Sequence, residues 1–216
     1  MIIRLSFFIS ICLLFCQFQF KSDPQPILRG NLLLHLPTDA MQKSYPVLIA
    51  FGGSMWATPQ FLWDNTPASY FEKAILVYSP CYTKGGGNLR KVESETRQFL
   101  KDKGIQAGQF SVCGFSSGGP DVMIAETPYR YRAIGLIDCS PVANGKVHYS
   151  ANMIFSFRRN NWVNSDYYGK VVNFKPFNDL MEQIRRVGGC VEESDISHEG
   201  YFRYFLEKFE RELIGY

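Results

Sequence analysis

Several signatures of common protein classes are missing from this sequence of 216 residues. Its six cysteines form no Cys-x-x-Cys pair and show no zinc-ligand spacing, so we expect no metal site. The formal charge is only +3, and no stripe of lysine and arginine interleaved with aromatic residues occurs, which argues against a nucleic-acid partner. The Walker pattern and the dinucleotide fingerprint are both absent, which excludes those two kinds of nucleotide site.

Internal repeats, low-complexity tracts and inter-domain linkers are also absent. A chain of this length fits one domain with a full-sized hydrophobic core, and 46% hydrophobic residues is ordinary for a globular protein. We therefore predict a single domain over residues 22–216.

Only one long apolar run occurs, and it lies at the N-terminus. Arg4 precedes it, residues 5–16 (LSFFISICLLFC) carry no charge, and Lys21 ends it. A membrane span needs roughly 20 apolar residues, so this shorter run suits the hydrophobic region of a secretory signal. We predict that residues 1–21 are a signal peptide or an N-terminal membrane anchor, and that the protein is exported. No clear small-x-small pair precedes Lys21, so cleavage and membrane attachment both stay open.

Export bears on the cysteines of the body, Cys81, Cys113, Cys139 and Cys190. An even number of cysteines in an exported protein allows disulfides, although the sequence does not give their connectivity. Cys113 lies in a strand-like run, which favours a small buried hydrophobe over a disulfide partner.

The body alternates between apolar, strand-like runs and amphipathic, helix-like segments. This alternation is typical of a mostly parallel sheet with crossover helices. Strands are predicted over 32–36, 45–51, 74–78, 109–113, 133–138, 153–157 and 190–196. Helices are predicted over 88–103, 120–126, 177–187 and 201–213.

A serine motif, Gly114-Phe115-Ser116-Ser117-Gly118, follows one of these strands and precedes a helix. A sharp strand-to-helix turn holds the serine side chain out at the edge of a sheet, where a base can activate it. Such a turn strains the backbone at the serine and crowds the positions two residues away, which glycine relieves. With Ser117 as the nucleophile, Phe115 would stand at a crowded position. We therefore predict Ser116 as the nucleophile.

With this element in place, the sequence resembles the α/β-hydrolase superfamily from about residue 27 to residue 216. The resemblance rests on the strand, nucleophile and helix, on the earlier Gly52-Gly53 turn, and on a late histidine, all in the superfamily's chain order. It implies a three-layer α/β-hydrolase fold, a mostly parallel sheet with helices on both faces. The segment between Asp138 and Met153, where the superfamily inserts lids, is short, so we expect a minimal lid.

Three histidines are candidates for the general base. His35 lies inside an early strand and His148 in a loop without a motif. His198 follows the final strand and precedes the final helix, which is where the superfamily places its base. Loops after parallel strands gather on one edge of the sheet, so we predict that His198 and Ser116 meet there.

The resemblance also implies an oxyanion hole made of two backbone N–H groups. One belongs to the residue after the nucleophile, Ser117, and the other to the turn after the strand 45–51. In that turn Gly53 is our first choice and Ser54 the second. The following residues Ser54, Met55 and Trp56 are predicted to bind substrate. Met55, Trp56, Phe61 and Trp63 could form an apolar acyl wall, or they could be core.

The acid of a triad is the least determined residue. Superfamily members usually carry it after the strand 153–157, where this chain has Arg158-Arg159-Asn160-Asn161, and asparagine cannot stabilise an imidazolium as a carboxylate does. Asp138 ends the preceding strand, in a context similar to that of lipases resembling pancreatic lipase. Asp166 lies a few residues beyond the asparagines. We favour Asp138 and keep Asp166 as the alternative.

These residues predict a serine hydrolase that cleaves esters or thioesters of a small-molecule or polymeric acyl substrate. The mechanism needs no cofactor and no metal. A peptidase or amidase shares the same acyl-enzyme chemistry and is the first alternative. The asparagines at the usual acid position motivate a second alternative, a non-catalytic protein that binds a ligand in the cleft.

Overall fold

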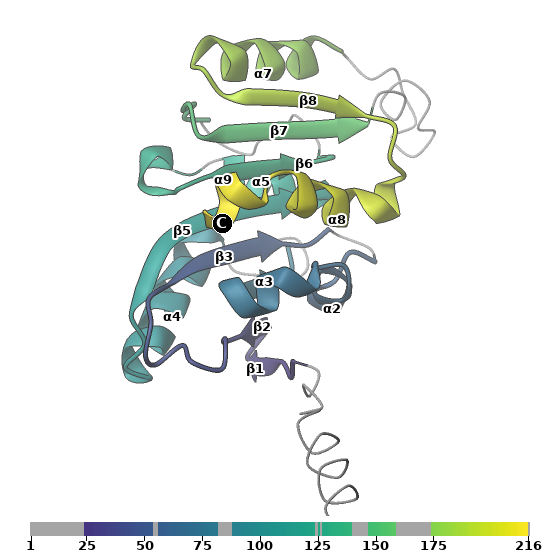
Figure 1. The fold of residues 1–216 in the computed structure, drawn as a ribbon. Coiled ribbons are helices and arrows are strands. Elements are labelled where there is room, and N and C mark those ends of the chain that lie inside the picture. Colours follow the sequence, from purple (N-terminus) through teal and green to yellow (C-terminus); the bar gives the residue numbers. More distant parts are fainter. Residues whose placement is uncertain are drawn as a thin grey trace, which may run out of the picture.

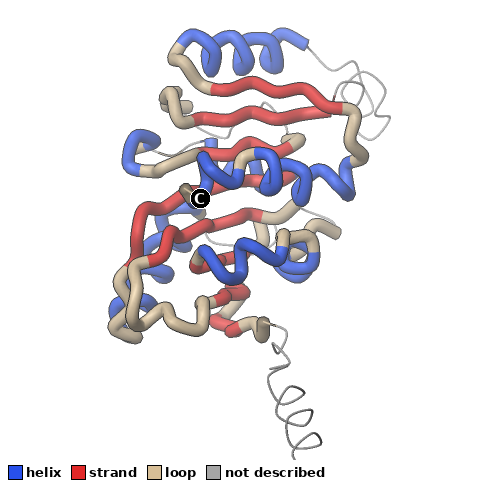
Figure 2. The backbone as a smooth tube through the Cα atoms, in the orientation of Figure 1, coloured by secondary structure: helices blue, strands red, loops and turns tan. Residues whose placement is uncertain are grey.

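The computed structural model describes residues 24–53, 56–81, 88–123, 125, 127–139, 147–158 and 174–215. Within these residues, one eight-stranded sheet has the strand order β1-β2-β4-β3-β5-β6-β7-β8 (Figure 1). Helices lie in front of and behind the sheet (Figure 2), so the predicted three-layer α/β architecture is confirmed. The predicted signal or anchor segment, residues 1–21, lies outside the described part. No described helix is both long enough and apolar enough to cross a membrane.

The structure gives the following bounds. The strands are β1 (Ile27–Arg29), β2 (Leu32–His35), β3 (Tyr45–Phe51), β4 (Ile75–Ser79), β5 (Ala107–Phe115), β6 (Ile134–Ile137), β7 (Met153–Arg158) and β8 (Cys190–Ser194). The α-helices are α2 (Pro59–Asp64), α3 (Ala68–Lys73), α4 (Leu89–Asp102), α5 (Gly119–Met123), α7 (Phe174–Arg186), α8 (His198–Lys208) and α9 (Glu210–Ile214). Two short 3₁₀ turns are η2 (Ser116–Gly118) and η3 (Pro128–Arg130).

The strands from β4 to β8 pair parallel, whereas β1 pairs antiparallel with β2 and β2 pairs antiparallel with β4. The register brings the carboxyl ends of the central strands level with one another. Phe51 pairs with Gly114, and Phe115 pairs with Ile137. The turns that follow β3, β5 and β6 therefore open on one edge of the sheet, where ligands of open α/β sheets bind.

The core lies on both faces of the sheet, because side chains alternate along each strand. In β3, Val47 and Ile49 pack on the face covered by α4, α5 and α7. Leu48 and Ala50 pack on the opposite face, which α2, α3, α8 and α9 cover (Figure 1). A strand buried on both faces has no polar side, which is why β3 forms an unbroken apolar run in the sequence.

Helix α4 agrees closely with its predicted range because its ends carry local signals. The Asn88 side chain accepts a hydrogen bond from Lys91 N at 2.9 Å, and Gly104 follows the helix with φ +68°. Helix α5 is shorter than predicted and ends at Met123. The predicted closing helix over 201–213 is in fact two helices, α8 and α9, which meet at Phe209.

Strand β1 and helices α2 and α3 were not predicted from the sequence. Helix α2 starts with a capped end, since Thr58 accepts from Phe61 N at 3.2 Å and Pro59 occupies the first turn. Both helices are only six residues long, too short to show a helical period. Their packing against the sheet, through residues such as Leu62 and Tyr70, stabilises them instead.

No disulfide joins any two of the four cysteines of the body. Cys113 is fully buried, in line with the expectation of a small core residue. Burial raises the pKa of the Cys113 and Cys139 thiols, and the neighbouring Asp138 charge adds to this rise at Cys139. Both thiols therefore stay protonated at neutral pH, and neither is a competing nucleophile.

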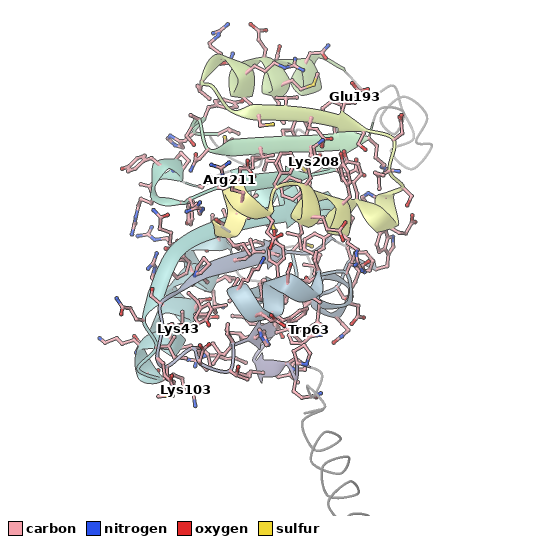
Figure 3. All side chains as sticks on the ribbon, in the orientation of Figure 1. Lys43, Trp63, Lys103, Glu193, Lys208 and Arg211 are labelled. Carbon is pink, nitrogen blue, oxygen red and sulfur yellow. The ribbon has the colours of Figure 1, made fainter. Side chains whose placement is uncertain are left out.

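A charged network holds α8 against β7 and β8. Glu192 accepts hydrogen bonds from Lys208 and Tyr204 on α8 and from Ser156 on β7, each at 2.5 Å. Figure 3 labels Lys208 between α8 and β7. Burial opposes ionisation of Glu192, but the three donors outweigh it and lower the pKa of this carboxyl below its usual 4.5. The network thus stabilises the helix that begins at His198.

Glu192→Gln should lower the free energy of unfolding by about 1–2 kcal/mol at pH 7, because the charged acceptor of three donors is lost. The lowered pKa makes this contribution fully present above pH 4.5, and it disappears as pH falls through the folded-state value. The gap between wild type and variant in urea unfolding should therefore close in acid. Glu207→Gln, in an exposed pair with Arg203, is the control. A gap of the same size at both pH values would contradict the prediction.

Candidate active site

Residues predicted to act together lie at the carboxyl edge of the parallel strands. Gly53 follows β3, Ser116 follows β5, and Asp138 follows β6. His198 is the first residue of α8, just after β8. Strands far apart in the sequence thus supply one cluster at one edge of the sheet.

The turn at Ser116 has the geometry that its motif predicts. β5 ends at Phe115, the 3₁₀ turn η2 begins at Ser116, and α5 follows at once. Ser116 has φ +56°, a left-handed conformation that costs a non-glycine residue about 1–3 kcal/mol. Strain of this kind is common at functional sites, where it presents a side chain at the apex of a turn.

Two glycines make this turn sterically feasible. A Cβ on Gly114 would lie 2.2 Å from Gly118 O, and a Cβ on Gly118 would lie 2.5 Å from Phe51 O. Both neighbours are backbone atoms, which cannot rotate away. Glycine at each side of Ser116 is therefore required by the close approach of β5, η2 and the end of β3.

Gly118→Ala should lower the free energy of unfolding by about 3 kcal/mol, because the new methyl group would overlap the carbonyl oxygens of Phe51 and Gly52. Urea unfolding measures the loss. The matched control is Gly200→Ala in α8, where the nearest atoms are 3.4 Å from the new Cβ. The control should be neutral or slightly stabilising. Equal losses in both variants would rule out the steric explanation.

The turn after β3 lies directly against the nucleophile. A Cβ built on Gly53 would be 3.1 Å from Ser116 Cβ and 3.3 Å from Ser116 Oγ. The N–H of Gly52 donates to Ser79 O at 2.9 Å and is therefore occupied. The backbone of Gly53 therefore lies next to the Ser116 side chain. Ser117 lies in η2, and its own hydroxyl is buried without a hydrogen-bond partner among the described residues.

The structure joins His198 to Asp138. His198 Nδ1 donates a hydrogen bond to Asp138 Oδ2. The Asp138 carboxylate is fully buried, whereas the His198 side chain is 20% exposed. The backbone holds the aspartate in position, because Asp138 N donates to Ser156 O at 2.7 Å. With Nδ1 occupied by the carboxylate, Nε2 is the ring nitrogen left for proton transfer.

Aromatic rings place His198 beside the nucleophile turn. Its ring stacks on Phe115, the residue before Ser116, with centroids 4.7 Å apart and an angle of 26° between the planes. Trp56 packs edge-on against the same imidazole, with centroids 5.3 Å apart, and also lies 6.1 Å from the Phe115 ring. The described residues include no hydrogen bond between the Ser116 hydroxyl and His198. Such catalytic contacts are often long in unbound enzymes and tighten when substrate binds.

The aromatic residues that follow β3 divide into two groups. Trp56 is 40% exposed and packs edge-on against Phe61 at 4.8 Å, next to the His198 ring. Trp63, which Figure 3 labels, is buried and contacts Phe71 and Tyr78, so it belongs to the core. Trp56 and Phe61 thus form an apolar wall beside the site, and Trp63 does not contribute to it.

Several residues that the sequence offered as candidates for the site are not seen at the carboxyl edge of the sheet. Ser54, Met55 and Asp166 lie outside the described residues. His35 lies elsewhere in the fold, and its Nε2 bonds to Phe71 O at 2.7 Å. Burial lowers the pKa of His35, which keeps it neutral. Among the described residues, no group of three or more His, Cys, Asp or Glu side chains could hold a metal ion.

Arg158 is a site residue that sequence reasoning did not identify. It is the last residue of β7, and its Nε donates to Asp138 Oδ2 at 2.5 Å. Its backbone N also donates to Asp138 Oδ1 at 3.3 Å. The sequence did contain one indication of this role. Arg158 is a cation at the end of β7, where members of the superfamily usually carry the acid of the triad.

Comparison with known proteins supports the fold assignment. No family model matches this sequence, and no curated protein does. Among solved structures, S-formylglutathione hydrolase from Agrobacterium tumefaciens matches with a TM-score of 0.57 and 11% identity, over 87% of this chain and 92% of that one. A serine hydrolase without a lid from Xanthomonas campestris matches with a TM-score of 0.54 and 13% identity, over 91% and 97% of the two chains.

A third match is acylaminoacyl peptidase from Pyrococcus horikoshii, with a TM-score of 0.57 and 11% identity. It covers 94% of this chain but 44% of the peptidase. Identities this low establish the architecture alone. The chain has the α/β-hydrolase fold, and the resemblance seen in the sequence is confirmed at that level.

Proposed function

We propose that this protein is a serine hydrolase that cleaves carboxylic esters or thioesters through an acyl-enzyme on Ser116. One observation carries the proposal. The strained Ser116 turn lies beside an imidazole, His198, whose Nδ1 is hydrogen-bonded to the buried carboxylate of Asp138. A serine beside a histidine that is itself bonded to an aspartate is the arrangement of a catalytic triad. The serine is the nucleophile, the histidine is its base, and the aspartate orients the base.

The reaction begins when Ser116 Oγ attacks the carbonyl carbon of the substrate. His198 Nε2 takes the hydroxyl proton, and Asp138 stabilises the imidazolium through Nδ1. The backbone N–H groups of Gly53 and Ser117 hold the oxyanion of the tetrahedral intermediate. The intermediate collapses, the leaving group takes the proton from His198, and the acyl group stays on Ser116. A water molecule activated by His198 then releases the acid.

The substrate is an acyl compound, either small or polymeric, and nucleic acid is not a partner. Trp56 stands at the surface beside His198, so an apolar group of the substrate can pack against it. Ser54 and Met55, which precede Trp56, belong to the same proposed binding segment. No cofactor or metal takes part in this chemistry. Export through residues 1–21, as a cleaved signal or as a membrane anchor, remains part of the proposal.

A peptidase or amidase on the same fold is the second candidate. The similarity to acylaminoacyl peptidase favours it, but the peptidase is more than twice as long as the aligned part. Comparing turnover of short p-nitrophenyl esters with that of aminoacyl p-nitroanilides separates the two. The proposal expects faster ester turnover. The motive for a non-catalytic protein weakens, because Asp138 supplies the carboxylate that the asparagines cannot.

A fluorophosphonate probe tests the nucleophile directly. The wild-type protein should be labelled covalently, and mass mapping should locate the adduct on Ser116. Ser117→Ala should still take the label, since the proposed contribution of Ser117 is its backbone N–H. A wild-type protein that is folded but takes no label would refute the assignment, as would an adduct on Ser117.

A further inference from the structure

Arg158 contacts the acid of the site, and the proposed mechanism gives it no role. Asp138 follows β6 directly, and the register places Ile137, the last residue of β6, opposite Ser156 of β7. Arg158 lies two residues beyond Ser156, so strand alternation places its side chain on the face that α8 covers. Ser156 confirms this face, since its hydroxyl contacts Tyr201 of α8 at 3.1 Å. Arg158 and His198 therefore approach the Asp138 carboxylate from two different elements.

The contacts at Asp138 are unusually complete for a single carboxylate. Oδ2 accepts from both His198 Nδ1 and Arg158 Nε, and Oδ1 accepts from the Arg158 backbone N. The Arg158 side chain is 21% exposed and Asp138 is fully buried, so this ion pair is largely desolvated. A buried carboxylate is costly unless charge and hydrogen bonds compensate it. A neutral imidazole offers one N–H bond and no charge.

Arginine is the side chain best suited to supply that compensation. Its guanidinium is charged at every physiological pH, and it is planar, so it fixes the orientation of an oxygen that it contacts. Arg158 thus balances Asp138 whether or not His198 carries a proton. The cation offsets part of the attraction between Asp138 and an imidazolium, but it prevents the carboxylate from turning away from Nδ1.

We propose that Arg158 is a positioning residue, whose positive charge at the end of β7 holds the Asp138 carboxylate in the orientation that fixes His198. The expected effect of Arg158 on kcat rests on the proposed hydrolase function. In this chain β6 supplies the acid, and β7 supplies the cation that holds it.

The test compares Arg158→Met, which removes the charge, with Arg158→Lys, which keeps it. Arg203→Met on α8 is the matched control, because Arg203 Nε also contacts a carboxylate, that of Glu207, at 2.9 Å, in an exposed pair. With a p-nitrophenyl ester, Arg158→Met should lower kcat by roughly 10- to 100-fold and change KM less than twofold, since the group acts on the base rather than on substrate. Arg158→Lys should recover most of kcat, and Arg203→Met should match wild type.

A double-mutant cycle shows whether Arg158 acts through Asp138. In an Asp138→Asn background, Arg158→Met should change kcat by less than about twofold, because the partner is already gone. The full loss persisting in that background would overturn the proposal. Equal losses in Arg158→Met and Arg158→Lys would also overturn it, because the charge would then not matter.

Proton NMR provides a readout that does not depend on activity. The far-downfield signal of His198 Nδ1–H should be sharp in wild type and Arg158→Lys, and broadened or lost in Arg158→Met. A second measurement needs only the wild-type protein, so it remains possible if Arg158→Met does not fold. The Arg158 Nε–H should exchange with solvent much more slowly than the Arg203 Nε–H. Fast exchange at Arg158, or an unchanged His198 signal in Arg158→Met, would refute the positioning role. Absence of ester turnover with these signals as expected would refute the hydrolase proposal alone.

Discussion

Ser116→Ala should lower ester turnover by at least about 10⁴-fold. The hydroxyl is the only group of the protein that forms a covalent bond to the substrate in the proposed mechanism, and no neighbouring group replaces it. Cys113 and Cys139 are buried and stay protonated. The Ser117 hydroxyl is buried as well. The measurement is kcat/KM for a p-nitrophenyl ester, with the spontaneous hydrolysis rate subtracted.

The fold should survive this substitution, which makes the result interpretable. Serine and alanine both carry a Cβ, so alanine meets the same strain at φ +56° and clashes with no new atom. The thermal midpoint of the variant should lie within a few degrees of wild type. Ser94→Ala, at an exposed position of α4, is the matched control and should keep full activity. Turnover by Ser116→Ala at the wild-type rate would remove the basis of the whole mechanism.

The parts of the fold that could be predicted share a physical property. β3 was predicted over the residues that form it, because a strand buried on both faces has to be apolar throughout. Helix α4 was predicted because its cap and its apolar stripe are local features. Strand β1 could not be predicted, since its three residues are exposed and show no alternation of apolar and polar side chains. α2 and α3 are helical because the sheet beneath them offers an apolar surface, which no short window of sequence reveals.

The same division holds for the site. The Ser116 turn was predictable because close approach between backbones demands glycine at fixed positions. The choice between Asp138 and Asp166 stayed open because it depends on how α8 lies over β6, a packing contact that sequence spacing does not encode. Arg158 has no motif at all. Its role depends on the register between β6 and β7, which brings Arg158 at the end of β7 next to Asp138 in the turn after β6.

Asp138→Asn should lower kcat by about 10³- to 10⁴-fold, whereas Asp166→Asn should change it less than about threefold. The amide has the shape of the carboxylate, but it cannot stabilise an imidazolium and can favour the wrong tautomer of His198. It also leaves the Arg158 guanidinium without its counter-charge in a largely buried site. Steady-state kinetics with a p-nitrophenyl ester measure both variants.

Asp179→Asn serves as the control, because Asp179 is exposed on α7 and makes no contact with His198 among the described residues. Fluorophosphonate labelling should slow in Asp138→Asn yet still occur at Ser116, since the nucleophile remains in place. Loss of activity in Asp166→Asn with activity retained in Asp138→Asn would mean that the bond seen at His198 Nδ1 is structural. The acid would then come from beyond β7, where the superfamily usually has it. That outcome would leave Ser116 and His198 in their proposed roles but would give the Asp138–Arg158 pair no part in catalysis.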